Sequence, residues 1–346
     1  MKKKIILSLF FVCSLASAVI TSCKKNDNSS TTTTTTAQLD AQTQQNNYDQ
    51  NNYKSESDQN DNDVNAALNG SSMMGMRLPA SNGSERLGYG TNSILYNPTA
   101  PCGATIDSSQ ISSKKIIFNF DGVTHCGYWP IRTRSGQITV QLTGANKWDN
   151  PGAVLTISFN NYKVTRLDNG HWIQFNGVKT LTDSAGFNAL TFLLGSTIIT
   201  YKERVHNMQV TFDGGDSAVW NSSRTVWWKC NSFATGDYTF TTIGDTIING
   251  NNNMSEWGTN RFNTGFVIYY NSQLVCNSLC SNYWKPTSGE IVYDVLNTNS
   301  TVAGSFTFDL NVDSHGTILT SGCPFYFKVT WVDSNSHSQY TVLPYL

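Results

Sequence analysis

Beyond residue 79, apolar and polar residues alternate with a period of two along many short stretches. In one of them, Ile138, Val140 and Leu142 are separated by Thr and Gln. Because successive side chains of a β-strand point to opposite faces, this alternation predicts strands with one apolar and one polar face. Comparable stretches lie at 116–120, 155–159, 306–310 and 325–331.

The turns between these stretches contain Asn-Gly and Asp-Gly-Gly sequences, such as Asn176-Gly177 and 213–215. Such sequences supply the positive φ that tight hairpins require. The pattern therefore predicts an all-β domain over 79–346, built as an antiparallel meander of long hairpins. A curved sheet, a sandwich or a partly open barrel would each bury the apolar faces and limit the exposed edges.

Residues 23–78 have a different composition. Residues 31–36 are all Thr, and 38–65 consist almost entirely of Gln, Asn, Asp and Ser with isolated Tyr residues. Such a segment offers little apolar surface to offset the entropic cost of ordering its backbone. We therefore expect 23–78 to be a disordered linker, in which a short helix over 63–68 is the one ordered element that the pattern allows.

The first 22 residues have the organisation of a signal peptide: lysines at positions 2–4 precede an apolar stretch that begins at residue 5. This apolar stretch is shorter than the roughly 20 residues of a membrane span. Ile20-Thr21-Ser22-Cys23 then resembles a bacterial lipobox, which predicts signal cleavage and a covalent lipid on Cys23. Ordinary signal-peptidase cleavage, leaving Cys23 unmodified, is the alternative.

The residues after Cys23 bear on localisation. Asp directly after the cysteine is typical of inner-membrane retention, whereas here Lys24 follows it. We therefore expect an outer-membrane lipoprotein, facing either the periplasm or the cell surface, with the membrane as a partner through its lipid anchor. Several acyl chains make such an anchor effectively permanent.

Composition narrows the possible activities. Only 14% of residues are charged and the formal net charge is -1, without a basic stripe in the β-domain. Nucleic acid is therefore not expected as a partner. The sequence also lacks the motifs of nucleophile elbows, phosphate loops and zinc hydrolases, so it assigns no catalytic residue, no metal and no cofactor besides the lipid.

Six cysteines remain after the signal peptide and Cys23. In an exported protein they predict a disulfide framework, with fifteen possible pairings. Zinc bound by Cys276 and Cys280 together with His125 or His315 is the alternative. The candidate disulfide cysteines are Cys102, Cys126, Cys230, Cys276, Cys280 and Cys323.

Exposed aromatic and cationic side chains on a sheet provide candidate binding residues. Trp227 and Trp228 are adjacent, so on a strand they must point to opposite faces. One of them could stack on a sugar ring or lie under a loop. Arg132 and Arg134 share one face of a predicted strand, where contact with an anionic glycan competes with plain solvation.

These residues also resemble a family of uncharacterised β-rich outer-membrane lipoproteins of Gram-negative bacteria. The similarity rests on Phe120-Asp121-Gly122, Cys126, the Arg-Thr-Arg-x-Gly strand motif over 132–138 and the Pro-Gly turn over 150–154. It extends to 222–227 and 276–291 and covers most of 114–332. His125 departs from the Gly usual before the first cysteine. The resemblance implies the same fold and localisation and assigns no activity.

Together these features predict a membrane-anchored, non-catalytic lipoprotein of the cell envelope. Its β-domain would bind a glycan or an envelope protein. A purely structural envelope or matrix role is the alternative, and a glycan-active hydrolase is the third hypothesis.

Overall fold

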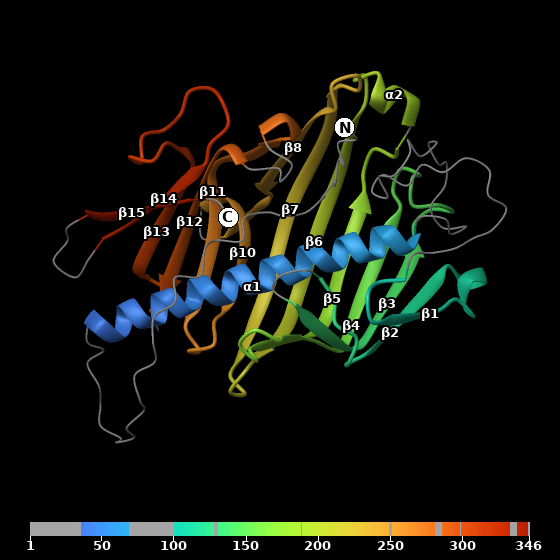
Figure 1. The fold of residues 1–346 in the computed structure, drawn as a ribbon, viewed down its shortest axis with the longest axis horizontal. Coiled ribbons are helices and arrows are strands. Elements are labelled where there is room, and N and C mark those ends of the chain that lie inside the picture. Colours follow the sequence, from blue (N-terminus) through green and yellow to red (C-terminus); the bar gives the residue numbers. More distant parts are fainter. Residues whose placement is uncertain are drawn as a thin grey trace.

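A computed structural model of the chain describes residues 36–68, 100–127, 131–187, 189–248, 251–280, 286–297, 299–332 and 338–344. Its described part is a 15-stranded antiparallel sheet and a 33-residue helix, α1 (Thr36–Leu68). The predicted all-β class and the meander of hairpins are confirmed. All described strands belong to one strongly curved sheet, and α1 lies across it at a steep angle to the strands (Figure 1).

Strand order follows the chain from β1 to β7 and from β10 to β15. Short helices are η1 (Ile111–Ser113), α2 (Ala189–Leu193) and η2 (Ser278–Cys280). The strands are β1 (Ala104–Asp107), β2 (Lys115–Asp121), β3 (Arg132–Thr143), β4 (Val154–Arg166), β5 (Trp172–Asp183), β6 (Ile198–Phe212), β7 (Ser217–Ser232), β8 (Asp237–Gly244), β9 (Thr246–Ile248), β10 (Asn251–Thr259), β11 (Gly265–Asn277), β12 (Pro286–Leu296), β13 (Val302–Val312), β14 (Tyr326–Val332) and β15 (Ser338–Pro344).

Between β7 and β11, the sheet contains two shorter strands, β8 and β10, in place of one continuous strand. Gly244 at the end of β8 pairs with Arg224 of β7, and Glu256 of β10 pairs with Ser222, two residues away on the same strand. β11 likewise pairs with both β8 and β10. β8 and β10 therefore lie end to end between β7 and β11, and the chain between them forms β9, which pairs with β10.

Bulges bend the long strands. Every pairing from β3 to β7 contains a register shift, and Asn161 and Asn207 take positive φ at two of them. The backbone N–H of Asn161 donates to the Asn176 side chain at 2.7 Å, and that of Asn207 to Asn221 at 2.8 Å. Gly136 lies opposite Asn161, and a Cβ atom on Gly136 would lie 2.1 Å from the carbonyl oxygen of Asn161. Because a bulge bends and twists its strand, this repeated feature explains the curvature.

The apolar rows predicted from the alternation form the core. Phe118, Val140, Leu155 and Ile157 are fully buried in one large cluster. The same cluster contains Tyr53 and three apolar residues near the end of α1, so the helix is packed on the sheet. At about 25 cal/mol per Å² of apolar surface, these rows are the main source of the stability of the sheet.

The linker prediction is wrong for residues 36–68, because this segment is helical and half of its described side chains are buried. The predicted signal peptide over 1–22, the lipidation site Cys23 and the linker segments 23–35 and 69–78 lie outside the described residues. Within the described part of the chain, no helix combines the length and the apolar character needed to cross a bilayer.

Two disulfides are formed, Cys102–Cys126 and Cys280–Cys323, so the expectation that all six cysteines pair is wrong. Cys230 and Cys276 are buried outside both bridges. They lie on β7 and β11, with β8 between them, and two strand spacings amount to about 9.6 Å. That distance exceeds the roughly 7 Å that a disulfide spans between Cα atoms. The alternative zinc site loses Cys280 to its bridge.

Candidate functional site

The buried side of α1 is mostly polar. Its buried residues recur at intervals of three or four, as expected for one face of a helix. Among the helix side chains that the structure describes, buried apolar residues occur at Tyr53 and near the helix end. The polar members of the buried face are Asn46, Asp49, Glu56, Ser57, Asn60 and Asp61.

Three acidic residues of α1 are spaced seven residues apart, and each binds an arginine of the sheet. The seven-residue interval corresponds to about two helical turns, so the three carboxylates lie on the same side of α1. Two of the arginines are on β3 and the third is in the turn after β10. The pairs are Asp49 with Arg261, Glu56 with Arg132, and Asp63 with Arg134, at N–O distances of 2.6, 2.6 and 2.5 Å.

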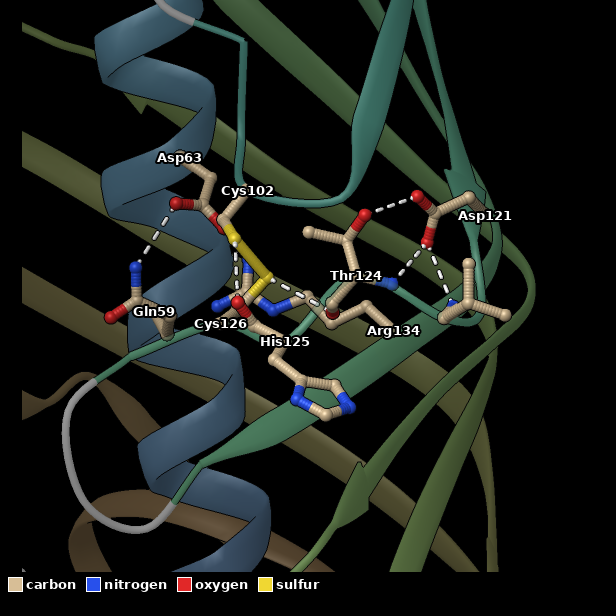
Figure 2. The surroundings of a disulfide bond; sticks show 9 residues. Gln59, Asp63, Cys102, Asp121, Thr124, His125, Cys126 and Arg134 are labelled. Atoms are coloured by element: carbon tan, nitrogen blue, oxygen red, sulfur yellow. Dashed lines mark hydrogen bonds and ion pairs between the residues drawn. A yellow bond between two sulfur atoms is a disulfide. The ribbon is translucent and has the colours of Figure 1, made fainter.

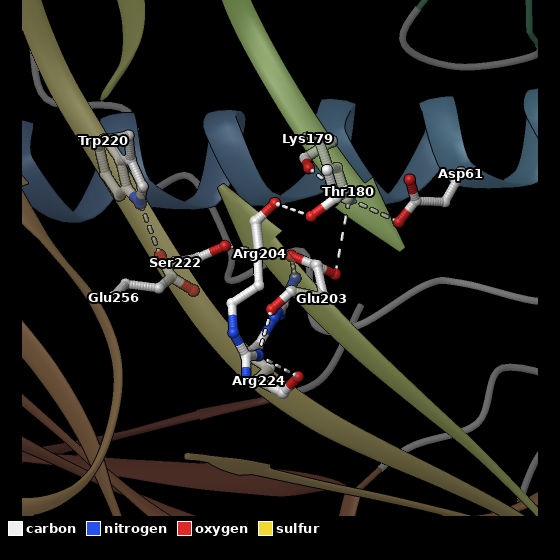
Figure 3. Close-up of polar contacts among 10 residues, drawn as sticks. Asp61, Lys179, Thr180, Glu203, Arg204, Trp220, Ser222, Arg224 and Glu256 are labelled. Carbon is white, nitrogen blue, oxygen red and sulfur yellow. Dashed lines mark hydrogen bonds and ion pairs between the residues drawn. The ribbon is translucent and has the colours of Figure 1, made fainter. Parts of the chain in front are cut away.

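Lys179 of β5 is the centre of a buried charge cluster beneath the middle of α1. Its Nζ donates to Asp61 at 2.6 Å and to Ser57 at 3.1 Å, and lies 3.5 Å from Glu203 of β6. Glu203 in turn accepts a hydrogen bond from Arg224 of β7 at 2.7 Å. Figure 3 shows these side chains meeting between α1 and the sheet. Charges of opposite sign thus alternate from the helix into the sheet.

An aromatic contact holds the centre of α1. Tyr53 stacks on Trp220 of β7 with ring centroids 4.3 Å apart, and also meets Phe175 at 5.7 Å. The indole N–H of Trp220 donates to Glu256 at 2.8 Å, which fixes the orientation of the ring. We call the sheet residues that receive α1 the cradle; they are Arg132, Arg134, Lys179, Trp220 and Arg261.

The electrostatics differ between the two sides of this interface. Burial raises the pKa of Asp49 and of Asp63 above the usual range, despite the opposing effect of Arg261 and Arg134. Burial also opposes the charge of Glu203, but the attraction of Arg224 and Lys179 outweighs it and lowers the pKa of Glu203. For Asp49 and Asp63 the loss of water therefore outweighs the attraction of the arginines, whereas Glu203 is held ionised by the neighbouring cations.

Several polar atoms at the interface remain without a hydrogen bond among the described residues. Both amide atoms of Asn60 are in this state although its side chain is fully buried, as are Asn46 Oδ1 and Glu56 Oε2. Each unsatisfied buried group costs roughly 1–3 kcal/mol. The contact between α1 and the cradle is thus specific in its charges and incomplete in its hydrogen bonds.

The structure places the predicted arginines in this site. Arg132 and Arg134 share a strand face, as expected, but solvation was the wrong expectation, because Arg134 is 5% exposed and both side chains are covered by α1. Figure 2 shows Arg134 and Asp63 beside the Cys102–Cys126 disulfide. Gln59 donates to the other oxygen of Asp63 at 3.0 Å, which orients this carboxylate.

Trp227 and Trp228 lie on the second half of β7, outside the contacts of α1. Trp228 packs against the core and meets Phe240 edge-on, with centroids 5.0 Å apart. Trp227 points to the opposite face of the strand. Both are half-buried, so neither is the freely exposed platform that stacking on a sugar would use.

The described residues show no catalytic arrangement at the cradle. Its cations pair with acids of α1, and no three His, Cys, Asp or Glu side chains among those described gather to hold a metal ion. His171 contacts Asp213 near Arg261, where both side chains are partly exposed. In the structure, the cations of the cradle bind carboxylates of α1.

Sequence reasoning missed most of this site. Lys179, Trp220 and Arg261 each occur in an ordinary strand or turn context, and nothing local marks them. The acids of α1 did carry a signal, since Asp49, Glu56 and Asp63 repeat at seven residues. Their polar neighbours hid the helical period. No family model, curated protein or solved structure matches this chain.

Proposed function

We propose that this chain is a membrane-anchored, non-catalytic lipoprotein of the cell envelope whose β-domain binds an acidic protein helix in the cradle. One observation carries the proposal: three arginines on a rigid sheet match three carboxylates spaced seven residues apart on α1. A matched set of this kind recognises both charge and helical geometry.

The shape of the cradle favours a helix over a glycan. From Asp49 to Asp63 the contact extends over fourteen residues, or about 21 Å of helix. The aromatic ring of the cradle, Trp220, stacks on a tyrosine of a helix with ring centroids 4.3 Å apart, so its occupant in the structure is a protein side chain rather than a sugar. The partner that fits is a protein segment, which agrees with an envelope-protein ligand rather than a glycan.

The lipobox-like Ile20-Thr21-Ser22-Cys23 supports the membrane anchor. Only twelve residues, 24–35, separate Cys23 from the start of α1. Even fully extended they span at most about 43 Å. With α1 in the cradle, the sheet therefore stands close to the bilayer, where it meets other envelope proteins.

Binding is tested with a fluorescent peptide of residues 36–68 added to the full-length chain. The chain carries Asp49→Asn, Glu56→Gln and Asp63→Asn, which weaken its own α1 without changing side-chain size. We expect saturable binding that weakens as salt is raised, because the contacts are ionic. The matched control is the same peptide with these three acids replaced by their amides, which should bind at least tenfold more weakly.

Equal binding of both peptides, or none of either, would contradict the proposal. The anchor is tested separately with Cys23→Ser, which should move the protein from the membrane fraction to the soluble fraction. A mutant that still sediments with membranes would rule out lipidation of Cys23 as the anchor.

A further inference from the structure

We infer that α1 is a built-in competitor, which occupies the cradle until an acidic helix of a partner protein, with carboxylates seven residues apart, displaces it. This inference rests on the proposed function and adds its regulation. Its basis is the way α1 is attached, the chemistry of its contact with the sheet and the charges that it would leave behind.

α1 can leave without breaking a strand pairing. Among the described residues, the contacts that join it to the sheet are between side chains, and no backbone hydrogen bond does so. The next described residue after Leu68 is 100, so 31 residues, 69–99, connect the helix to the rest of the chain. That length reaches about 100 Å when extended, ample for α1 to move off the cradle while the sheet stays folded.

The polar chemistry of the contact suits it to exchange. Buried ion pairs offset much of their own attraction through desolvation. The raised pKa values of Asp49 and Asp63 are a direct sign of that cost. The amide of Asn60 stays unsatisfied among the described residues, although it is fully buried. A partner helix without such a group at this position would bind the same cations with fewer losses.

The vacated cradle would need a new anionic occupant. Arg132, Arg134, Lys179 and Arg261 each lose their α1 carboxylate when the helix leaves. Of these, Lys179 keeps Glu203, while Arg261 keeps only the more distant acids of the β6–β7 turn. The four cations lie on one face of the sheet and attract an acidic segment. The partner that fits them has the acid spacing of α1.

Because α1 is tethered, it competes at an effective concentration in the millimolar range. The apparent affinity for a partner is then reduced by the fraction of molecules with an open cradle. A change that weakens α1 must therefore tighten binding of a partner helix. A ligand that bound elsewhere on the sheet would be indifferent to α1.

The test compares affinities of one probe, the fluorescent 36–68 peptide, for three full-length proteins. These are the unmodified chain, Tyr53→Ala, which removes the stack on Trp220, and the control Tyr340→Ala, which truncates a tyrosine that is 62% exposed on β15. We expect Tyr53→Ala to bind the probe at least tenfold more tightly than the unmodified chain, and Tyr340→Ala to match the unmodified chain. Near-ultraviolet circular dichroism checks that the sheet is folded.

A second variant keeps the test valid if Tyr53→Ala misfolds. Glu56→Gln combined with Asp63→Asn preserves the side-chain volumes of α1, and this variant should also bind the probe more tightly than the unmodified chain. If all proteins bind with the same affinity, the probe does not compete with α1 and this inference fails, while the proposed function is still judged by whether the amide-substituted peptide binds more weakly. If no protein binds the probe, the proposed function itself fails. Dimers of the unmodified chain that grow with concentration and are dissolved by the probe would make a second copy the occupant and overturn the partner assigned here.

Discussion

The apolar rows of the sheet and the cradle under α1 lie on the same curved scaffold, but different chemistry holds each of them. Phe118 and Val140 are fully buried among other apolar residues, so their contribution grows with the area removed from water. At the cradle, Lys179 is 1% exposed and depends on Asp61 and Glu203. The first region is stable because it is apolar, and the second is selective because its charges must match.

This difference separates folding from recognition. An apolar row tolerates another side chain of similar volume, whereas an arginine facing a carboxylate rejects any occupant that lacks the negative charge. We therefore expect the sheet to remain folded when α1 leaves it. Mutations in the two regions should accordingly have different consequences.

The largest effect is expected from Phe118→Ala in β2. This ring is fully buried, and truncating a buried aromatic residue costs about 3–5 kcal/mol. Denaturant titration should show this loss in the unfolding of the whole sheet. Phe233→Ala, which removes a ring that is 59% exposed, is the control and should change the free energy of unfolding by less than about 0.5 kcal/mol. Similar losses in both variants would contradict the assignment of this core.

Tyr53→Ala should release α1 while the sheet stays folded. Losing the stack on Trp220 removes about 3 kcal/mol from a contact whose other apolar residues lie near the end of α1. Hydrogen exchange should then be fast in α1 and unchanged in β3–β7. If protection fell in both regions together, α1 would be part of the folding unit of the sheet and the two regions could not be treated separately.

The sheet could be predicted from the sequence because its signal is local. Alternation in 138–142 and 306–310 identifies strands without knowledge of their partners, and turn glycines separate them. α1 could not be predicted in this way, because its buried face is made of Asn, Asp and Glu. This polar face can be buried because cations from β3, β5 and the β10–β11 turn pair with it. These cations are far apart in the sequence, and only the fold brings them together.

The same limit applies to the cysteines and to the tryptophan pair. Cysteine count indicates a disulfide framework, but the strand between Cys230 and Cys276 that keeps them apart is a property of the topology. Alternation correctly separates the faces of Trp227 and Trp228. It cannot show that both are half-buried, since that depends on neighbouring segments.

A double-mutant cycle on Asp63 and Arg134 would sharpen the distinction between stability and selectivity. Arg134→Met alone leaves Asp63 facing the sheet without its cation, and Asp63→Leu alone leaves Arg134 without its anion. Each single change should therefore weaken the docking of α1, which is measured by hydrogen exchange in α1. The double variant should recover most of the loss, with a coupling free energy of about 1–2 kcal/mol. If the two losses were additive, the coupling free energy between Asp63 and Arg134 would be zero, and the pair would not make the contact selective.

The smallest effect concerns Asp183, a buried carboxylate at the end of β5 that is held by backbone groups, with no cation paired to it among the described residues. Its oxygen accepts hydrogen bonds from the N–H groups of Ala185 and Gly186, at 3.1 and 2.7 Å. Burial raises the pKa of Asp183 to about 6, in contrast to Glu203, whose cations lower its pKa. A carboxylate without a cationic partner is thus a cost when ionised.

The sign of the pH dependence follows from this pKa. The folded state holds the proton of Asp183 up to about pH 6, whereas the unfolded chain releases it near its ordinary value of 3.8. The stabilising effect of Asp183 is therefore complete below that value and disappears as pH rises through about 6. Asp183→Asn keeps an oxygen that accepts both hydrogen bonds and cannot ionise. At pH 7.5 it should raise the free energy of unfolding by about 1 kcal/mol after screening by water, and it should flatten the loss between pH 4 and about 6. An unchanged pH profile in this variant would show that the Asp183 carboxylate carries no such cost, and that burial without a cation is tolerated at the end of β5.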